Sequence, residues 1–194
     1  MYKRQGLLRE DAEHSYVADE AGNRVTPPAG ATDAFLMPYH VTRGCLYVQE
    51  RFAHEPLVDI PTVVSHIEMT RFPVPEHGRY QPVDTLGGLV RAADLIGQIG
   101  DPLYNQKLAR LFVELNETGE AKRLGYTNVN DLRAGFPAFF QNHVHPYVTE
   151  GLRFLGKTQE GQRWLANLAK QLQGEINEAA NEPPNRPQIA INNG

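Results

Sequence analysis

The sequence predicts an all-α protein, and two observations carry that prediction. Apolar residues recur at helical spacing in successive segments, which Gly- and Pro-rich stretches separate. Strand-like alternation of apolar and polar residues does not extend over a useful length, and there is no internal repeat. The 194 residues suit a single domain with its own core, and 41% hydrophobic and 22% charged residues are ordinary for a globular protein.

The composition also limits the classes of partner. With 19 basic and 23 acidic residues the net charge is -4, so the chain lacks the basic footprint of a protein that binds a nucleic-acid polymer. No apolar run approaches the roughly 20 residues that span a bilayer, so no membrane partner is expected. The single cysteine, Cys45, excludes a disulfide framework within the chain and fits a reducing compartment. We therefore expect a cytoplasmic protein.

The first expected helix follows a polar stretch. Residues 11–35 carry Gly, Asn and a Pro pair, which predicts an exposed loop. Pro38 stands where a first helical turn tolerates proline. The segment "YHVTRGCLYVQERF" then places apolar residues at helical spacing, namely Val41, Cys45, Val48 and Phe52. Because Cys45 lies on this apolar face, we expect it to be a small buried hydrophobe.

Capping residues mark the second and third helices. Asp59 can cap a helix through "PTVVSHIEMTRF", with Pro61 in its first turn. The Pro-rich stretch "PVPEHGRYQPVDT" predicts a loop, after which Asp84 or Thr85 can cap the helix "LGGLVRAADLIGQIG".

The rest of the chain predicts further helices. A fourth helix in "PLYNQKLARLFVELNETGEAKRLG" carries one apolar face and ends near Gly119 or Gly125. Two or three more helices follow, with aromatic residues at core spacing. We expect one helical domain over residues 6–175, a flexible tail over 176–194, and a non-native or truncated start over residues 1–5.

Asp94 is the first candidate for chemistry, because it interrupts the apolar helix "LVRAADLIGQIGDP". An isolated buried carboxylate is costly and needs a partner. Two partners remain open from the residues alone. One is Arg91, three residues away on the same helix, and the other is a metal ion.

Histidines on the two preceding helices extend the metal interpretation. His40 and His66 precede Asp94 by one or two helix-plus-loop units, so adjacent helices can bring the three to one level of a bundle. Imidazole and carboxylate together suit divalent metal ions. Glu68 faces elsewhere on the helix of His66 and is expected near the surface or behind the ligands.

The remaining histidines favour other roles. His143 and His145, beside Pro146, are expected at a helix start in structural or surface positions. Loop histidines are expected to be solvated, namely His14, His54 and His77.

The three central helices resemble the later part of the HD-superfamily metal-dependent phosphohydrolases. The resemblance rests on "YHVTRG", "VVSHIEMTRFPVP" and "LVRAADLIGQIGDP", taken in that order. The downstream "DLRAGFPAFF" and "HPYVTEGLRFLGKTQEGQRWLANL" are similar to C-terminal helices of that superfamily, and coverage is roughly residues 6–170.

The resemblance implies an HD-domain-like helical bundle and a hydrolase. Asp94 would be the closing metal ligand, while His40 and His66 would help to hold a second ion or contact the phosphate. The implied cofactor is a divalent ion such as Mn, Fe or Mg, in a binuclear site in the complete protein. Arg91 and Arg71 would neutralise phosphate charge, unless they face solvent instead. The implied substrate is a small phosphate ester or nucleotide.

The chain departs from that superfamily at its defining motif, since no His-Asp dyad occurs in it. The resemblance places the dyad just before Gly6-Leu7-Leu8, where this chain has Lys3 and Arg4, and two cations cannot ligate a metal. We therefore expect a partial site that binds metal weakly. The rival interpretation is a non-catalytic HD-like helical module for ligand sensing or protein interaction.

Overall fold

The computed structural model describes residues 15–181 of the chain, with side chains for residues 15–173. Most of this part is helical, which confirms the predicted all-α fold. The α-helices are α1 (His40–Arg51), α2 (Ile60–Glu68), α3 (Leu86–Ile99), α4 (Tyr104–Glu117), α5 (Glu120–Arg123), α6 (Val129–Phe139), α7 (His145–Leu155) and α8 (Gln159–Asn181).

The expected loop over residues 11–35 was only partly correct. From residue 15 onward it contains a short antiparallel hairpin, in which β1 (Tyr16–Val17) pairs with β2 (Arg24–Val25). Side chains stabilise this hairpin, because the Arg24 Nε donates to the Ser15 Oγ at 2.6 Å. Because polar side chains make these hydrogen bonds, the hairpin does not require alternating apolar residues. The spacing of apolar residues therefore could not predict the hairpin.

A 3-10 helix and α1 follow the hairpin. The 3-10 helix η2 (Asp33–Tyr39) contains Pro38 and leads directly into α1. Val41, Cys45 and Val48 are buried on one face of α1, as the apolar spacing predicted. The first helix of the sequence analysis is therefore confirmed, with its start at His40.

The predicted caps of α2 and α3 are both present. The Asp59 Oδ1 accepts a hydrogen bond from the Thr62 backbone N–H at 3.2 Å. The Thr85 Oγ accepts one from the Gly88 N–H at 3.1 Å, so Thr85 rather than Asp84 caps α3. Helix α2 ends at Glu68, earlier than "PTVVSHIEMTRF" suggested. Proline disfavours helical geometry in the residue before it, so Phe72, which precedes Pro73, could not continue α2.

Two glycines in left-handed backbone conformation close the next helices. Gly119 has a φ of +77° and separates α4 from α5, and Gly125 has a φ of +75° after α5. Glycine adopts such values without the penalty that a Cβ brings. The predicted end of the fourth helix near these residues is confirmed.

The helices α6 and α7 join through the π-helical turn η4 (Phe140–Val144). Pro146 stands in the first turn of α7, where the lack of an N–H costs nothing. His145 begins α7, which confirms the expected helix start.

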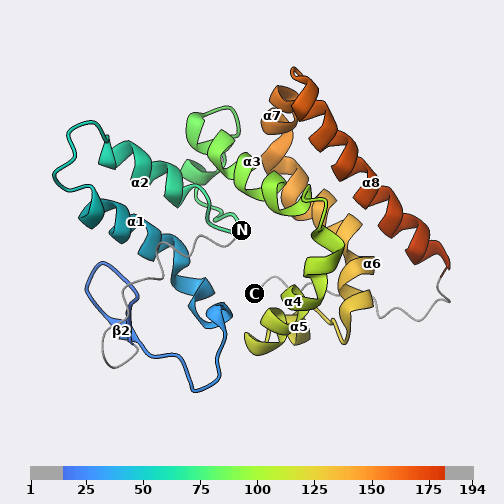
Figure 1. Cartoon of the computed structure of the whole chain (residues 1–194), viewed down its shortest axis with the longest axis horizontal. Coiled ribbons are helices and arrows are strands. Elements are labelled where there is room, and N and C mark those ends of the chain that lie inside the picture. The colour runs from blue at the N-terminus through green and yellow to red at the C-terminus, as the bar shows by residue number, and fades with distance from the viewer. Residues whose placement is uncertain (1–14, 182–194) are drawn as a thin grey trace.

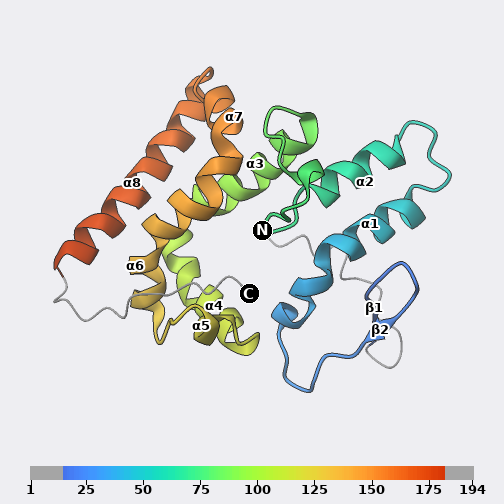
Figure 2. The same ribbon diagram turned by 180° about the vertical axis from the view of Figure 1, so that it is seen from behind.

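Helix α3 lies between the N-terminal helices α1 and α2 and the C-terminal helices α6, α7 and α8 (Figures 1 and 2). It packs against α2 on one side and α7 on the other, and α1 packs on α2 (Figure 1). The view from behind shows α6, α7 and α8 together on the far side of α3 from α1 and the hairpin (Figure 2). The hydrophobic core lies on that far side and includes Ile96, Leu108, Phe136 and Val148. A second link is the Thr32 hydroxyl, which donates to the Glu117 Oε2 at 2.6 Å and so joins the start of η2 to α4.

Within residues 15–181, no helix combines the length and the apolar character that crossing a membrane requires. The predictions for residues 1–5 and for His14 lie outside the described residues, as does most of the predicted tail.

Candidate functional site

His40 occupies the first position of α1, and one of its two ring nitrogens contacts the protein backbone. Its Nδ1 lies within hydrogen-bond distance of the Met37 carbonyl oxygen, which can only accept. The proton of the neutral ring must therefore sit on Nδ1, and the lone pair on Nε2. Metal-ligating histidines show this arrangement, because the bond to the carbonyl fixes the tautomer and orients the ring.

His66 lies on α2 against the start of α3. A Cβ on Gly87 would stand 3.4 Å from the Cδ2 of His66 and 2.8 Å from the Cγ of Met69. The missing side chain of Gly87 therefore allows α2 to approach α3 at this point. His66 consequently lies beside the first turn of the third helix.

Asp94 is half-buried on α3, seven residues beyond Gly87. Residues seven apart lie on nearly the same face of an α-helix, about 10 Å apart along its axis. His66, which lies beside Gly87, and Asp94 are therefore at nearly the same face of α3 but at different heights along its axis. In the part of the chain that the structure describes, no three His, Cys, Asp or Glu side chains converge to hold a metal ion. The expected meeting of His40, His66 and Asp94 at one point is thus not seen among these residues.

The alternative partner for Asp94, a salt bridge with Arg91, was wrong. Arg91 is only 1% exposed, and its guanidinium donates to the carbonyl oxygens of Tyr80 and Pro82. It also lies over the Tyr147 ring, 4.8 Å from the ring centroid. Burial lowers the pKa of Arg91. A solvent-facing Arg91 was equally wrong, because the loop before α3 folds over this side chain.

Arg71 is likewise engaged by the protein. Its guanidinium donates to both carboxylate oxygens of Glu68, at 2.7 Å and 2.6 Å, and to the Thr42 hydroxyl at 2.9 Å. The pair is half-buried, and the hydrogen bonds to Glu68 raise the pKa of Arg71. The structure therefore places Arg71 as a link between α1 and the end of α2.

Glu68 is the residue whose role sequence reasoning missed. Besides Arg71, the Tyr80 hydroxyl donates to its Oε2 at 3.2 Å, and the Cys45 thiol lies 3.6 Å from its Oε1. Arg79, which is largely exposed, approaches the same Oε2 at 4.0 Å. The only signal in the sequence was the Glu68–Arg71 spacing of three residues.

Cys45 has the buried position that its helix face predicted. Burial, together with the nearby Glu68 carboxylate, raises the pKa of the Cys45 thiol to about 12. Because the thiolate is the nucleophilic form, the folded protein keeps this cysteine unreactive.

The other histidines take structural or solvated positions. His143 packs beside Phe139 and His145 beside Phe140, with ring centroids 5.6 Å and 5.9 Å apart. His54 is exposed, as expected for a loop residue.

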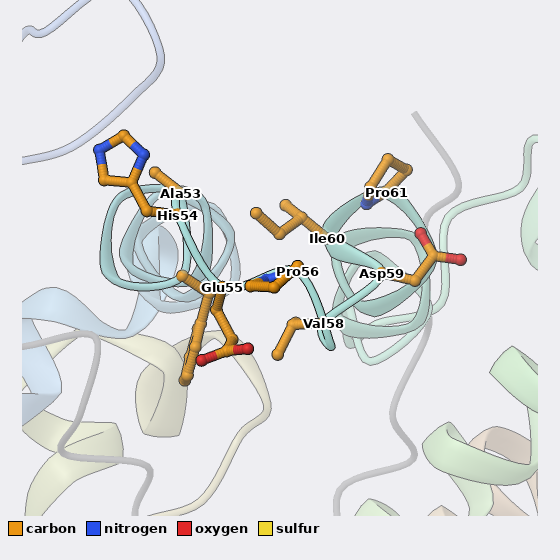
Figure 3. Close-up of a pocket in the computed structure, with 9 residues that line it drawn as sticks. Ala53, His54, Glu55, Pro56, Val58, Asp59, Ile60 and Pro61 are labelled. Atoms are coloured by element: carbon orange, nitrogen blue, oxygen red, sulfur yellow. The ribbon is translucent and has the colours of Figure 1, made fainter.

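An open hollow of about 470 Å³ lies at the turn between α1 and α2. It is lined by Phe52, Ala53, His54, Glu55, Pro56, Val58, Asp59, Ile60 and Pro61. Figure 3 shows the His54 ring and the Asp59 carboxylate on opposite sides of it, pointing away from each other. Asp59 is already occupied as the cap of α2. The polar groups therefore do not converge on a ligand here, and the hollow lies at the end of the α1–α2 pair away from His40 and His66.

Comparison with known proteins places the chain in a family. A family model described as Npun_R2479-like matches residues 2–176, which is most of the chain. The chain belongs to the Npun_R2479-like family. The match covers every helix discussed above, at least through the first part of α8. No curated protein and no solved structure matches the chain.

Proposed function

We propose that this member of the Npun_R2479-like family contributes ligands to a divalent-metal site of the HD phosphohydrolase type, acting on a small phosphate ester or nucleotide. The observation that carries the proposal is the bond between the His40 Nδ1 and the Met37 carbonyl oxygen, which leaves Nε2 able to bind a metal.

The placement of the other two residues supports the same interpretation. His40 lies at the end of α1 that packs near the end of α2, since Thr42 reaches Arg71 and Cys45 reaches Glu68. His66 lies beside Gly87, on the helix that also carries Asp94. The three proposed ligands are thus on three helices packed in succession.

The described side chains do not by themselves form a complete metal site. Within residues 15–173 the three do not converge, so an ion at His40 or at Asp94 would need further ligands. If bound, such an ion would supply Lewis acidity toward the phosphoryl group and would lower the pKa of a coordinated water. Arg71 and Arg91 would have to leave Glu68 and the loop carbonyls before they could contact a phosphate. With one cysteine, held unreactive, we place this activity in the reducing cytoplasm.

Metal titration of the chain tests the proposal. We expect weak Mn²⁺ binding in isothermal titration calorimetry, and His40→Ala and Asp94→Asn should each weaken it by about tenfold or more. His54→Ala is the matched control, because His54 is an exposed histidine close to α1 that makes no comparable bond to the backbone within residues 15–181. Turnover of p-nitrophenyl phosphate with Mn²⁺ should be slight and should disappear in the same two variants.

If His54→Ala weakens binding as much as the other two, the ions bind adventitiously and the proposal fails. If no variant alters binding, or the chain binds no metal, the rival helical module for sensing or interaction becomes the better interpretation.

A further inference from the structure

A continuous series of side-chain contacts runs from α1 to α7 through the loop between α2 and α3. The Thr42 hydroxyl accepts from Arg71, Arg71 donates to Glu68, and Glu68 accepts from the Tyr80 hydroxyl. The Tyr80 carbonyl oxygen in turn accepts from Arg91 of α3, whose guanidinium lies over the Tyr147 ring of α7.

Tyr80 is the residue on which this series depends. It is buried in the short 3-10 helix η3 (Gly78–Tyr80), and it is bonded at both of its polar ends. The hydroxyl is attached to Glu68 at the end of α2, and the carbonyl to Arg91 in the middle of α3. Through its side-chain hydroxyl and its backbone carbonyl, Tyr80 therefore connects the two helices.

Arg91 completes the connection from the side of α3. It carries a buried charge whose bonds within the described chain go to carbonyl oxygens, and its Nε has no partner there. Burying a cation without a carboxylate is expensive. A planar guanidinium reaches the Tyr80 and Pro82 carbonyls with two different nitrogens while stacking on Tyr147, which a lysine ammonium cannot do.

We infer that Tyr80 and Arg91 are positioning residues that hold α2 at a fixed spacing from α3, and thereby hold His66 relative to Asp94. The need to hold that pair rests on the proposed function, whereas the spacing itself is a property of the fold. Neither residue contacts a reacting group in this assignment.

Spin labels on the two helices measure the spacing directly. Ser65 on α2 and Gln98 on α3 are exposed, so nitroxide labels at Ser65→Cys and Gln98→Cys disturb no buried contact. The native Cys45 can stay, because burial and its high pKa keep it from reacting. Double electron–electron resonance should give a narrow distance distribution in the parent and a broader one in Tyr80→Phe, which removes the hydrogen bonds that the hydroxyl makes with Glu68 and Arg79.

Two further variants sharpen the result. Arg91→Lys should also broaden the distribution, because one ammonium cannot bond both carbonyls. Tyr126→Phe is the matched control, since Tyr126 lies between α5 and α6 and takes no part in the series. Far-UV circular dichroism at the measuring temperature confirms that each variant is folded.

A distribution that stays narrow in Tyr80→Phe overturns the inference, as does equal broadening in Tyr126→Phe. Positioning further requires that Tyr80→Phe lower Mn²⁺ affinity by about tenfold while Tyr126→Phe leaves it unchanged. Broadening with unaltered affinity would contradict the positioning role. If the parent binds no Mn²⁺, the proposed function fails, and the distance distribution alone still decides whether Tyr80 sets the spacing.

Discussion

The Glu68 carboxylate shows how one residue can acquire its role entirely from its neighbours. It accepts hydrogen bonds from Arg71 and Tyr80, and its side chain is 25% exposed. The bonds from Arg71 lower the pKa of Glu68, although burial acts in the opposite direction. A carboxyl whose pKa is lowered by folding stabilises the folded state where it is ionised.

We predict that Glu68→Gln makes the free energy of unfolding less dependent on pH in the acidic range. The contribution of Glu68 is present above its usual pKa of 4.5 and is lost as the pH falls through the lower value of the folded state. At about pH 7 the variant should lose about 1.5–3 kcal/mol in urea unfolding, the range for hydrogen bonds to charged groups.

As the pH falls from about 7 toward about 3, the difference between Glu68→Gln and the parent should shrink, because protonation of Glu68 progressively removes its contribution. Glu160→Gln is the control, because the Glu160–Arg163 pair is highly exposed and should contribute little at either pH. A Glu68→Gln difference that is the same at both pH values would contradict the assigned role.

At the scale of elements, the contact between α3 and α7 depends on a close approach of the two helices. A Cβ on Gly151 of α7 would stand 2.7 Å from the Cβ of Ala92 and 3.2 Å from the Cδ1 of Ile96. Ala92 and Ile96 both belong to α3 and are buried in the hydrophobic core. A different face of α3 is open to solvent, and Leu86, Val90, Ala93 and Gly97 are all exposed along it.

Two glycine-to-alanine substitutions should therefore have opposite effects. Gly151→Ala should destabilise the fold by about 1–3 kcal/mol, because the added methyl forces the helices apart. Gly97→Ala meets nothing within 4 Å and should stabilise α3 by up to about 1 kcal/mol through helix propensity. Urea unfolding of both variants measures the difference, and equal effects would show that α3 and α7 are not tightly packed at Gly151.

At the scale of the whole molecule, burial is unevenly distributed. The hydrophobic cluster joins α3, α4, α6, α7 and α8, and the buried residues of α1 are not part of it. The hairpin, η2, α1 and α2 are attached to that core mainly through α3 and through the Thr32–Glu117 hydrogen bonds (Figures 1 and 2). Regions with few core contacts open at lower free energy than the core itself.

Hydrogen exchange should therefore reveal two levels of protection. We predict that backbone amides of α1 and α2 exchange at least about tenfold faster than those of α3 and α7. Mass spectrometry of peptides from the full chain measures this, and Thr32→Val should widen the gap by removing the hydroxyl that bonds Glu117. Uniform protection across the four helices would show that the chain unfolds as a single cooperative unit.

Local chemistry made much of the fold predictable. Asp59 and Thr85 cap their helices because a side-chain oxygen needs only the next turn of its own helix. The buried face of α1 and the glycine ends of α4 and α5 follow from helical periodicity and from the backbone freedom of glycine. The hairpin was not predicted, because the hydrogen bonds that stabilise it come from polar side chains.

The candidate site was less predictable, because its groups are set by contacts between distant segments. Arg91 and Asp94 are close in sequence, yet the arginine bonds a loop that precedes its helix. Glu68 was expected near the surface or behind the metal ligands. In the structure it accepts hydrogen bonds from both Arg71 and Tyr80. By itself the sequence determined where α1, α2 and α3 begin and which face α1 buries, since capping and periodicity act within a few residues. Only the tertiary structure decided which charges meet and how His66 stands relative to Asp94, because those depend on the path of the loop between α2 and α3.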